Sequence, residues 1–494
     1  MAAGGVAWGT AAARWALLAA VLGSGMAFLD GTIVNVALPA IGEDLDADLT
    51  GLQWVLDSYL VTLTALVLLG GSLGDRFGRR RIFLVGVVIF VVASAACGAA
   101  PTTEALVAAR ALQGVGGALL VPGSLALLSA TIRSTDRSRA VGAWSGLTGV
   151  ASAGGPLLGG YLVDAASWRL AFLINLPLAV PVFLAARHVP ESVDPDAAGG
   201  HLDIPGALTA AFGLALLAGG LIEGGVGWEP LPVAAAVTGV ALLGLFVVIE
   251  RRSPDPMLPP ALFADRQFTG ANLVTFAVYA GLGGALFLVV VGLQVALGYS
   301  ALSAGLAMLP ITLLMLALSA RAGALAQRIG PRLPMTIGPL VVALGLSLLA
   351  GVSPGDGYVT GVLPGVLVFG LGLAATVAPL TATVLGAVDE HHLGVGSAAN
   401  NAVARLAGLL AVAVLPVVAG VDIAGAGPEG FPGYATALRI AAALCVVGAG
   451  VAAATIRTAS PTEPTTQASI LQPCQHPCRA DDDAPGLEGA ASRS

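Results

Sequence analysis

The amino-acid sequence predicts an all-α polytopic membrane protein with fourteen transmembrane helices. Of its 494 residues, 56% are hydrophobic and 10% are charged, whereas soluble domains carry about 25% charged residues. The apolar runs have the length of about 20 residues that a helix needs to cross the hydrocarbon core, and barrel strands would be about half as long. Because lipid offers the backbone no hydrogen-bond partners, we expect each run to be a helix.

Fourteen apolar segments follow one another with short connections, which place neighbouring spans antiparallel. The first segment is too long for a cleaved signal peptide and contains Asp30, so we take it as the first span. The expected spans are residues 15–38, 52–72, 82–100, 104–129, 140–162, 168–187, 204–223, 231–250, 269–293, 302–322, 334–351, 360–386, 396–419 and 434–456.

Arginine residues gather in alternate connections between these spans. The chain has 22 basic and 29 acidic residues, a formal net charge of −7, and no lysine. Arginine marks the connections near residues 76–81, 133–139, 187, 251–266 and 328–332. Asp and Glu dominate the other set, where Arg169 is the main basic exception. The positive-inside rule therefore places the arginine-rich connections and both termini in the cytoplasm. The acidic connection at residues 389–392 departs from this rule.

The turn at residues 71–81 carries five charges and three glycines, and a related turn occurs at residues 323–332. The two turns align without a gap, and Gly71, Arg76, Gly78 and Arg80 match Gly323, Arg328, Gly330 and Arg332. We interpret them as corresponding parts of two parallel repeats, as in transporters built from two homologous halves. The first copy follows the second span and the second copy follows the tenth. One pair of spans was therefore inserted between two six-helix halves.

This repeat divides the chain into five parts. They are a cytoplasmic N-terminus (1–14), an N-terminal six-helix bundle (15–190), an inserted helix pair (200–252), a C-terminal six-helix bundle (265–457) and a disordered cytoplasmic tail (458–494). Cys97 and Cys445 lie in apolar spans and are expected to pack. Cys474, His476 and Cys478 lack the fourth ligand of a zinc site, so we expect no metal.

Short motifs occur in the order and spacing of a known family. They are residues 29–39 in the first span, Gln53-Trp54 and Tyr59-Leu60 in the second, Arg110, Gln113, Gly114 and Gly116 in the fourth, Gly154-Gly155-Pro156 with Gly159-Gly160 in the fifth, Trp168-Arg169, Phe172, Asn175 and Pro177 in the sixth, Asp203, Gly206 and Trp228 in the inserted pair, and Arg405 and Gly408 in the thirteenth.

With these motifs, and with the turn at residues 71–81, the chain resembles the major facilitator superfamily, specifically its fourteen-spanner drug:proton antiporters. The resemblance covers almost everything up to residue 457. It implies the major facilitator fold, with two six-helix bundles plus two inserted central helices. Three residues depart from the family: Asp57 stands where a neutral residue is usual, Ala151 replaces a glycine, and Gln327 replaces the acid of the second turn.

The resemblance also implies a function. It implies a proton-coupled antiporter that exports lipophilic, often cationic, drugs or antibiotics across a bacterial cytoplasmic membrane by alternating access. Its partners would be the bilayer, the substrate and protons, without nucleic acid, and it would act as a monomer. We expect no enzymatic activity and no cofactor, because the proton gradient would drive transport. ATP drive is excluded, since a phosphate-binding loop of the Walker type needs a lysine and the chain has none. A dedicated exporter of one endogenous metabolite or self-made antibiotic remains an alternative, and a transporter-like sensor without flux is a third.

Three ionisable residues are candidates for proton coupling. Asp30 and Arg110 lie inside apolar spans, where charged groups are expensive and usually functional. An apolar environment favours a neutral carboxylic acid, whereas an approaching arginine favours the carboxylate, so movement of Arg110 relative to Asp30 would release a proton. Asp57 could recognise a cation or take a second proton. Each residue also has a structural alternative. Asp30 could be a buried hydrogen-bonded acid, Arg110 could be bound to backbone carbonyl groups, and Asp57 could lie at the start of a helix at the membrane interface.

The turn at residues 71–81 is a candidate cytoplasmic gate. Its arginines could pair with acids such as Asp136 and latch the outward-open state, although arginines placed there for topology alone are the simpler alternative. The residues assigned to the gate are Gly71, Gly74, Asp75, Arg76, Gly78, Arg79, Arg80, Asp136 and Arg328.

The fifth span carries a glycine-rich motif around Pro156, which is expected to bend the helix and to seal a leak path, unless the glycines only allow close packing. Polar and aromatic residues of other spans could face a central cavity, although each alone is more simply explained by packing. The bend motif is Gly154, Gly155, Pro156, Gly159 and Gly160, and the cavity candidates are Asn35, Trp54, Tyr59, Gln113, Tyr279, Gln294, Asn400 and Asn401.

Overall fold

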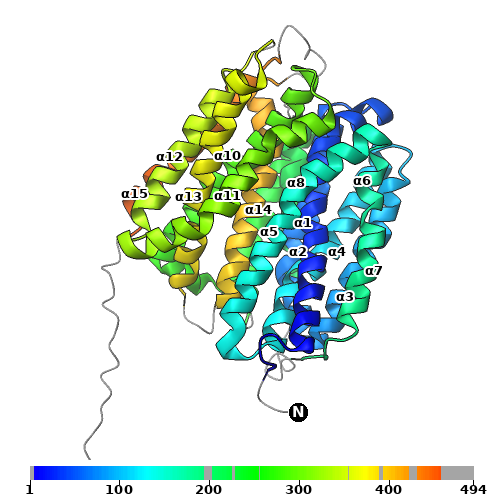
Figure 1. The fold of residues 1–494 in the computed structure, drawn as a ribbon, viewed down its shortest axis with the longest axis vertical. Helices are drawn as coiled ribbons and strands as arrows, with labels where there is room; N and C mark the ends of the chain where they lie inside the picture. Colours follow the sequence, from blue (N-terminus) through cyan, green and yellow to red (C-terminus); the bar gives the residue numbers. More distant parts are fainter. Residues whose placement is uncertain are drawn as a thin grey trace, which may run out of the picture.

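The computed structural model describes residues 5–193, 203–224, 229–254, 256–353, 355–388, 393–421 and 431–457. Almost all of these residues are helical. Two groups of helices lie side by side, one from each half of the sequence (Figure 1). The predictions made for Trp228, for the connection at 389–392 and for the tail at 458–494 lie outside the described residues.

The N-terminal half forms one packed group. Its helices are α1 (Ala11–Leu45), α2 (Leu49–Phe77), α3 (Arg79–Gly98), α4 (Thr103–Thr131), α5 (Ser134–Ala165), α6 (Arg169–Leu173) and α7 (Asn175–Ala186). α4 packs against α2 and α3, and α1 packs against α5, α4 and α7. The side chains of Thr10, Asp48 and Thr102 accept hydrogen bonds from the first turns of α1, α2 and α4, which satisfies backbone N–H groups that a helix leaves free.

The C-terminal half forms a second packed group. Its elements are η2 (Pro260–Ala264), α10 (Arg266–Val295), α11 (Ala301–Ile329), α12 (Arg332–Leu349), η3 (Tyr358–Val362), α13 (Leu363–Gly386), α14 (Leu393–Ala419) and α15 (Tyr434–Thr455). α13 packs against α12 and α11, while α15 packs against α10 and α12.

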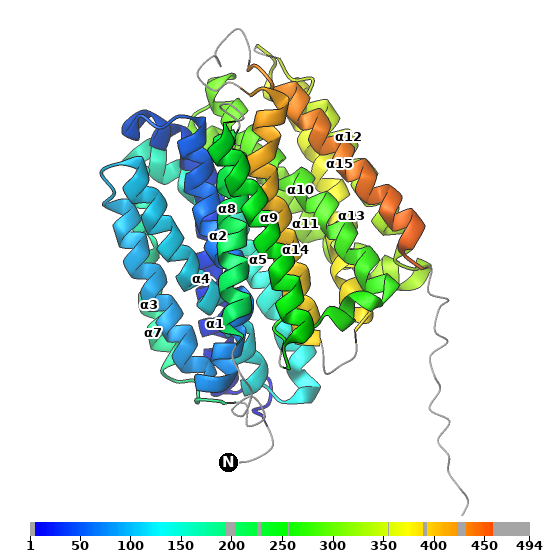
Figure 2. The same ribbon diagram turned by 180° about the vertical axis from the view of Figure 1, so that it is seen from behind.

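Two further helices connect the halves. α8 (Ile204–Gly224) and α9 (Pro230–Arg252) pack against each other as a hairpin, and Figure 2 shows them between the two groups. α8 also packs against α2 of the N-terminal half and α14 of the C-terminal half. Only about 6% of the apolar stretch of α9 is buried. Lipid is the environment that suits such an apolar exposed helix.

Each of the fourteen expected spans coincides with one helix or with two consecutive helices. By length and composition, twelve helices of the described residues are able to cross a membrane, and α2, which is bent by 49°, makes a thirteenth. α5 does not meet the same threshold, because glycine, serine and threonine dilute its apolar residues. The structure therefore supports a polytopic membrane protein, but the count of fourteen is not confirmed.

The two turns that define the repeat have the same backbone conformation. Gly78 ends α2 with φ 109°, and Gly330 ends α11 with φ 85°, values that side chains with a Cβ rarely adopt. In each turn, the arginine two residues after this glycine binds a main-chain carbonyl near the end of the last helix of its own half. Arg80 Nη1 donates to Val189 O over 3.0 Å, and Arg332 Nη2 donates to Ala453 O. This correspondence supports the duplication.

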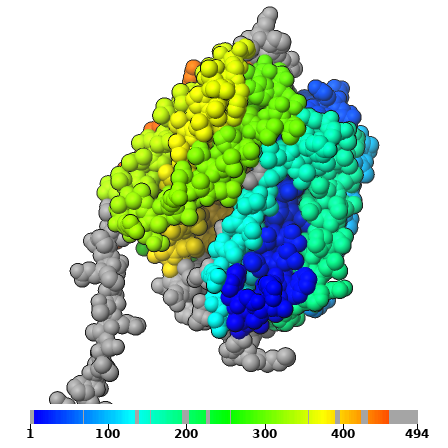
Figure 3. Space-filling view, viewed as in Figure 1, coloured from blue at the N-terminus to red at the C-terminus, as the bar shows by residue number. Residues whose placement is uncertain are grey.

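The two halves meet at one end of the molecule. We call the helix ends near residues 76–81, 133, 251–252 and 328–332 the arginine-rich face, and the ends near residues 43–48, 104 and 164 the acidic face. At the acidic face, both oxygens of the Asp164 carboxylate accept from backbone N–H groups of Ala301 and Leu302. Towards the arginine-rich face the halves diverge, and a hollow lies between them (Figure 3).

Candidate functional site

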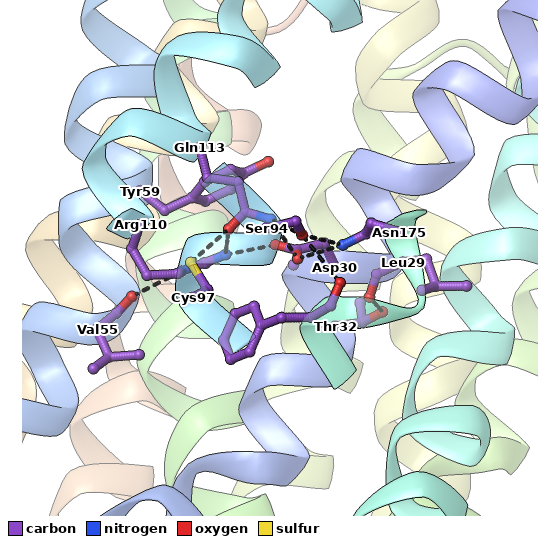
Figure 4. A network of polar contacts seen from close by, with 12 residues as sticks. Leu29, Asp30, Thr32, Val55, Tyr59, Ser94, Cys97, Arg110, Gln113 and Asn175 are labelled. Carbon is purple, nitrogen blue, oxygen red and sulfur yellow. Dashed lines mark hydrogen bonds and ion pairs between the residues drawn. The ribbon is translucent and has the colours of Figure 1, made fainter. Parts of the chain in front are cut away.

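A buried ion pair joins α1 to α4 inside the N-terminal half. Asp30 is fully buried and Arg110 is 1% exposed. Arg110 Nη1 lies 2.5 Å from Asp30 Oδ2, although 80 residues separate the two positions in the chain. Figure 4 shows their side chains pointing towards each other. The predicted approach of Arg110 to Asp30 is therefore present in this conformation.

Two amide side chains complete the environment of the carboxylate. Gln113 Nε2 donates to Asp30 Oδ1 over 2.8 Å, and Asn175 Nδ2 donates to the same oxygen over 3.1 Å. Both amides also donate to the Ser94 hydroxyl, at 3.0 and 2.8 Å. Helices α1, α3, α4 and α7 thus each contribute a polar side chain to one network (Figure 4). Both oxygens of the Asp30 carboxyl therefore have hydrogen-bond donors.

Arg110 has further partners besides the carboxylate. Its Nε donates to Val55 O over 3.1 Å, and Nη1 also donates to Gln113 Oε1 over 2.7 Å. The guanidinium lies 4.3 Å from the centre of the Tyr59 ring, a distance typical of cation–π contact. Arg110 therefore combines both predicted roles: its Nε binds a backbone carbonyl, and its Nη1 forms the ion pair with Asp30.

Asp57 has a different environment. It is fully buried in α2, and neither carboxyl oxygen has a hydrogen-bond partner. It therefore does not lie at a wet helix start, as the simplest alternative supposed. Gln53, one turn earlier, donates to Val412 O of α14 over 2.6 Å. Asp57 thus lies on a helix that contacts the opposite half, and a charge on it would be unpaired.

A cavity of about 870 Å³ separates the two halves beyond the contacts at the acidic face. α1 and α5 line it from one side, and α10, α11 and α13 line it from the other. The lining is mainly apolar. Its polar groups are hydroxyls and one amide, from Thr32, Asn35, Ser152, Thr312, Ser319 and Thr381. Among the described residues that line it, none is charged.

Helix α1 is the wall between this cavity and the buried ion pair. Thr32 and Asn35 line the cavity, whereas Asp30 belongs to the network with α3, α4 and α7. Residues two apart on a helix lie on nearly opposite sides, so the cavity and the carboxylate contact different faces of α1. The two sites are neighbours, but they are not one site.

Glycines of α5 allow close approach on two sides. A Cβ at Gly155 would lie 1.9 Å from Thr32 Oγ1, and one at Gly159 would lie 3.0 Å from Ile33; both neighbours are on α1. A Cβ at Gly160 would lie 2.5 Å from the Leu302 backbone of α11. α5 is therefore wedged between α1 of its own half and α11 of the other half.

Comparison with known proteins identifies the family. Residues 20–412 match the model of the Major Facilitator Superfamily. The chain belongs to this superfamily. The puromycin resistance protein of Streptomyces alboniger is 36% identical over 409 residues, covering 82% of this chain and 81% of that protein. The tetracenomycin C resistance and export protein of Streptomyces glaucescens is 35% identical over 408 residues, covering 81% and 75%. The multidrug resistance protein Stp of Mycobacterium tuberculosis is 35% identical over 403 residues, covering 81% and 74%.

Solved structures of the superfamily share the fold. A D-xylose–proton symporter superposes with a TM-score of 0.65 at 15% identity, covering 91% of this chain and 99% of the symporter. The human organic anion transporter MFSD10 superposes with a TM-score of 0.60 at 18% identity, covering 90% and 100%. The predicted resemblance is thus confirmed, and so is the expected multi-pass membrane protein, whose relatives named above are bacterial.

The arginine-rich turn of this superfamily member forms contacts within its own half. Arg79 Nε lies 2.8 Å from Asp75 Oδ1. The Glu191 carboxylate accepts from the backbone N–H groups of Arg80 and Arg81, and it lies against Gly78. Glu191, which sequence reasoning missed, therefore caps the start of α3. An acidic residue only a few positions after the end of a span was the feature of the sequence that could have indicated this role.

Asp136 has other partners than those predicted. It accepts from Arg133 Nε over 2.5 Å and from the backbone N–H of Trp8 over 2.9 Å. Arg328, in the second copy of the turn, is exposed. Asp136 thus binds groups of its own half and joins the N-terminal segment to α5. Its predicted pairing with Arg76, Arg79 or Arg80 is not among its described contacts in this conformation. A latch that holds the halves together at this face is expected only when the hollow there is closed.

All eight residues expected to line a cavity are among those that the structure describes, and of these eight only Asn35 lines the cavity of about 870 Å³. Tyr59 and Gln113 belong to the Asp30 network. The others are used in helix packing or lie elsewhere: Trp54 donates to Glu223 of α8, Asn400 donates to Asn272 and Thr275, Gln294 donates to Val36 O, Tyr279 packs in the C-terminal core, and Asn401 is exposed outside the lining. Polar groups in apolar spans mostly satisfy one another between helices, so polarity alone did not identify the lining.

Proposed function

We propose that this protein exports lipophilic drugs or antibiotics across the cytoplasmic membrane in exchange for protons, by alternating access. The buried Asp30–Arg110 pair beside a central cavity carries the proposal. Relatives at about one third identity are named for resistance to, or export of, puromycin, methylenomycin and tetracenomycin C. Membership of a superfamily of transporters, together with the cavity between the two halves, supports a transporter and not an enzyme.

The cavity favours neutral, lipophilic substrates. Its volume of about 870 Å³ falls in the range of about 300–1,000 Å³ that drug-sized ligands occupy. Met308 and Met315 lie in its wall, and methionine adapts to irregular apolar shapes. A cationic substrate gains little there, because the lining offers hydroxyl and amide groups but no carboxylate. The cavity therefore supports the lipophilic substrates that the resemblance implied more than it supports the cationic ones.

Proton coupling follows from how the pair would respond to movement. In this conformation Asp30 accepts from Arg110, Gln113 and Asn175, which favours the carboxylate. If α4 moved away from α1, the carboxyl would lose its counter-charge in an apolar interior. Neutralisation by a proton is the least costly response of a buried carboxyl. Asp57, buried without a partner, is a second position that would carry a proton.

The arrangement of the halves suggests which state of the cycle this is. The arginine-rich face is expected to be cytoplasmic, with both termini on that side. The halves touch at the acidic face and diverge at the arginine-rich face, which corresponds to a conformation open to the cytoplasm. Cavity and ion pair are both formed by residues of one chain, so the proposed cycle requires no residue of a second subunit.

A dedicated exporter of one metabolite is the second candidate. It is favoured by relatives named after single antibiotics, such as tetracenomycin C and cephamycin. A sensor without flux has no comparable support, because it would not need the buried ion pair.

Transport by everted vesicles tests the proposal. Vesicles should take up a neutral lipophilic dye when a proton gradient is imposed, and Asp30→Asn should abolish this uptake while the protein still reaches the membrane. Asp46→Asn is the matched control, because Asp46 ends the same helix, is exposed, and has a left-handed conformation that Asn also adopts. Undiminished gradient-driven uptake by Asp30→Asn would refute the coupling. Protection by one compound only would favour the dedicated exporter.

A further inference from the structure

Two buried carboxyl groups meet at the base of the inserted hairpin, outside both six-helix bundles. Asp203 immediately precedes α8 and is 8% exposed, and Glu250 lies in the last turn of α9 and is 3% exposed. The contacts of Gly213 with Leu243 and of Gly220 with Ala236 fix the register of the antiparallel hairpin. This register places Asp203 opposite Glu250, and the two carboxyls act on each other. In a helix with a mostly exposed surface, Glu250 is one of only two buried residues, the other being Gly239. Its burial therefore needs a specific explanation.

Each carboxyl has one oxygen satisfied and one oxygen without a partner. Asp203 Oδ1 accepts from the backbone N–H of Gly206 over 2.8 Å, and Glu250 Oε2 accepts from the backbone N–H of Leu258 over 2.9 Å. Asp203 Oδ2 and Glu250 Oε1 are buried and have no donor. The neighbouring arginines, Arg251 and Arg252, are exposed, and no ion pair to either carboxyl is found among the described residues.

Two ionised carboxylates side by side would repel each other where their unpaired oxygens are buried. One proton removes this conflict, because a protonated carboxyl donates to the ionised one and both remaining oxygens are then satisfied. We propose that Asp203 and Glu250 form a proton-binding site that holds one shared proton, separate from the Asp30–Arg110 pair. The proton belongs to the two carboxyls together, since such a pair titrates as a unit.

The site joins three segments of the chain. Asp203 fixes the start of α8, Glu250 fixes the end of α9, and Leu258 belongs to the connection that leads through η2 to α10. With the proton bound, the hairpin is fastened to the first helix of the C-terminal half. Loss of the proton leaves two carboxylates side by side and loosens this joint. The groups facing Glu250 are the carboxyl of Asp203, just before α8, and the backbone N–H groups of Met257 and Leu258 from the connection.

Stability measurements on the full-length protein in detergent test the proposal. Because the folded state binds a proton that the unfolded chain does not, the unfolding midpoint of the wild type should fall as the pH is raised. Glu250→Gln should remove this dependence, since the Gln amide donates permanently to Asp203. Glu229→Gln is the matched control, because Glu229 lies exposed at the other end of the same helix without a capping hydrogen bond. It should behave as the wild type.

Infrared spectroscopy provides a second and independent readout. The wild type should show the carbonyl stretch of a protonated carboxylic acid, diminished in both Asp203→Asn and Glu250→Gln and unchanged in Glu229→Gln. Equal spectra in Glu250→Gln and Glu229→Gln would overturn the proposal. If Ca²⁺ or Mg²⁺ raised the unfolding midpoint of the wild type but not that of Glu250→Gln, the site would bind a cation, and the shared proton would also be refuted.

Discussion

Removal of either member of the buried ion pair should destabilise the protein, but only the loss of Arg110 should make the destabilisation depend on pH. Asp30→Asn leaves the Arg110 guanidinium without a counter-charge among its described contacts. These are then Val55 O, Gln113 Oε1 and the rings of Tyr59 and Phe172. Arginine does not lose its charge in proteins. Breaking a buried pair in this way costs about 3–5 kcal/mol, and the loss should be nearly independent of pH.

Arg110→Met instead leaves a carboxyl that can be neutralised. Taking up a proton at about pH 7, against an ordinary value near 3.9 for aspartate, costs about 4 kcal/mol, so near neutrality the two variants should be similarly unstable. Each unit of lower pH reduces that cost by about 1.4 kcal/mol. Between about pH 7 and pH 5, Arg110→Met should therefore recover about 2.7 kcal/mol relative to the wild type.

Denaturant titration of the purified protein, followed by tryptophan fluorescence at the two pH values, measures these differences. The wild type supplies the pH dependence of all other groups. The double variant Asp30→Asn with Arg110→Met has no unpaired charge and should be more stable than Asp30→Asn alone. A constant deficit of Arg110→Met between the two pH values would refute the reasoning, because it would show that Asp30 does not take up the proton.

Three further changes test the contacts around this site. Gly160→Leu should push α11 from α5 by overlap with Leu302, at a cost of about 1–3 kcal/mol, and so increase thiol labelling of cysteines introduced at the acidic face; unchanged labelling would contradict this. Asp164→Ala removes the acceptor for two N–H groups at the start of α11 and should lower stability by about 1–2 kcal/mol, measured by thermal unfolding, whereas Asp164→Asn should lose less. Gly78→Ala would place a Cβ at a residue with φ 109° and against the Glu191 carboxylate. It should lower the free energy of unfolding by about 1–3 kcal/mol, and an unfolding midpoint equal to that of the wild type would show that the backbone there is not strained.

The helices could be predicted because length and hydropathy are local properties. The number of spans was less certain at α5, where the glycines that permit close packing with α1 and α11 also lower the hydropathy of the segment. The same residues thus weaken the signal of a span and provide its tertiary role. The turns at Gly78 and Gly330 were predictable, because in each of them glycine and arginine occur together between two apolar segments of the sequence.

The candidate site could be predicted only in part. Asp30 and Arg110 are isolated charges in apolar spans, so their importance is visible without a structure. Ser94 has no such signal, because a serine in an apolar span is usually satisfied by its own helix. The cavity hydroxyls Thr312 and Ser319 are equally ordinary in sequence. Which face of a helix meets the cavity depends on how the halves pack, and no local pattern contains that information.

The position of α1 limits how proton binding can affect the cavity. Asp30 lies on one face of this helix and Thr32 on the other, where Thr32 Oγ1 donates to Ser152 O of α5 over 3.1 Å. The Gly155 and Gly159 contacts leave no space between α1 and α5, and close-packed interfaces shift as units instead of deforming gradually. We infer that a change at Asp30 reaches the cavity through movement of α1 and α5 together. Since α5 also carries the contacts with α11, that movement would act directly on the closure at the acidic face.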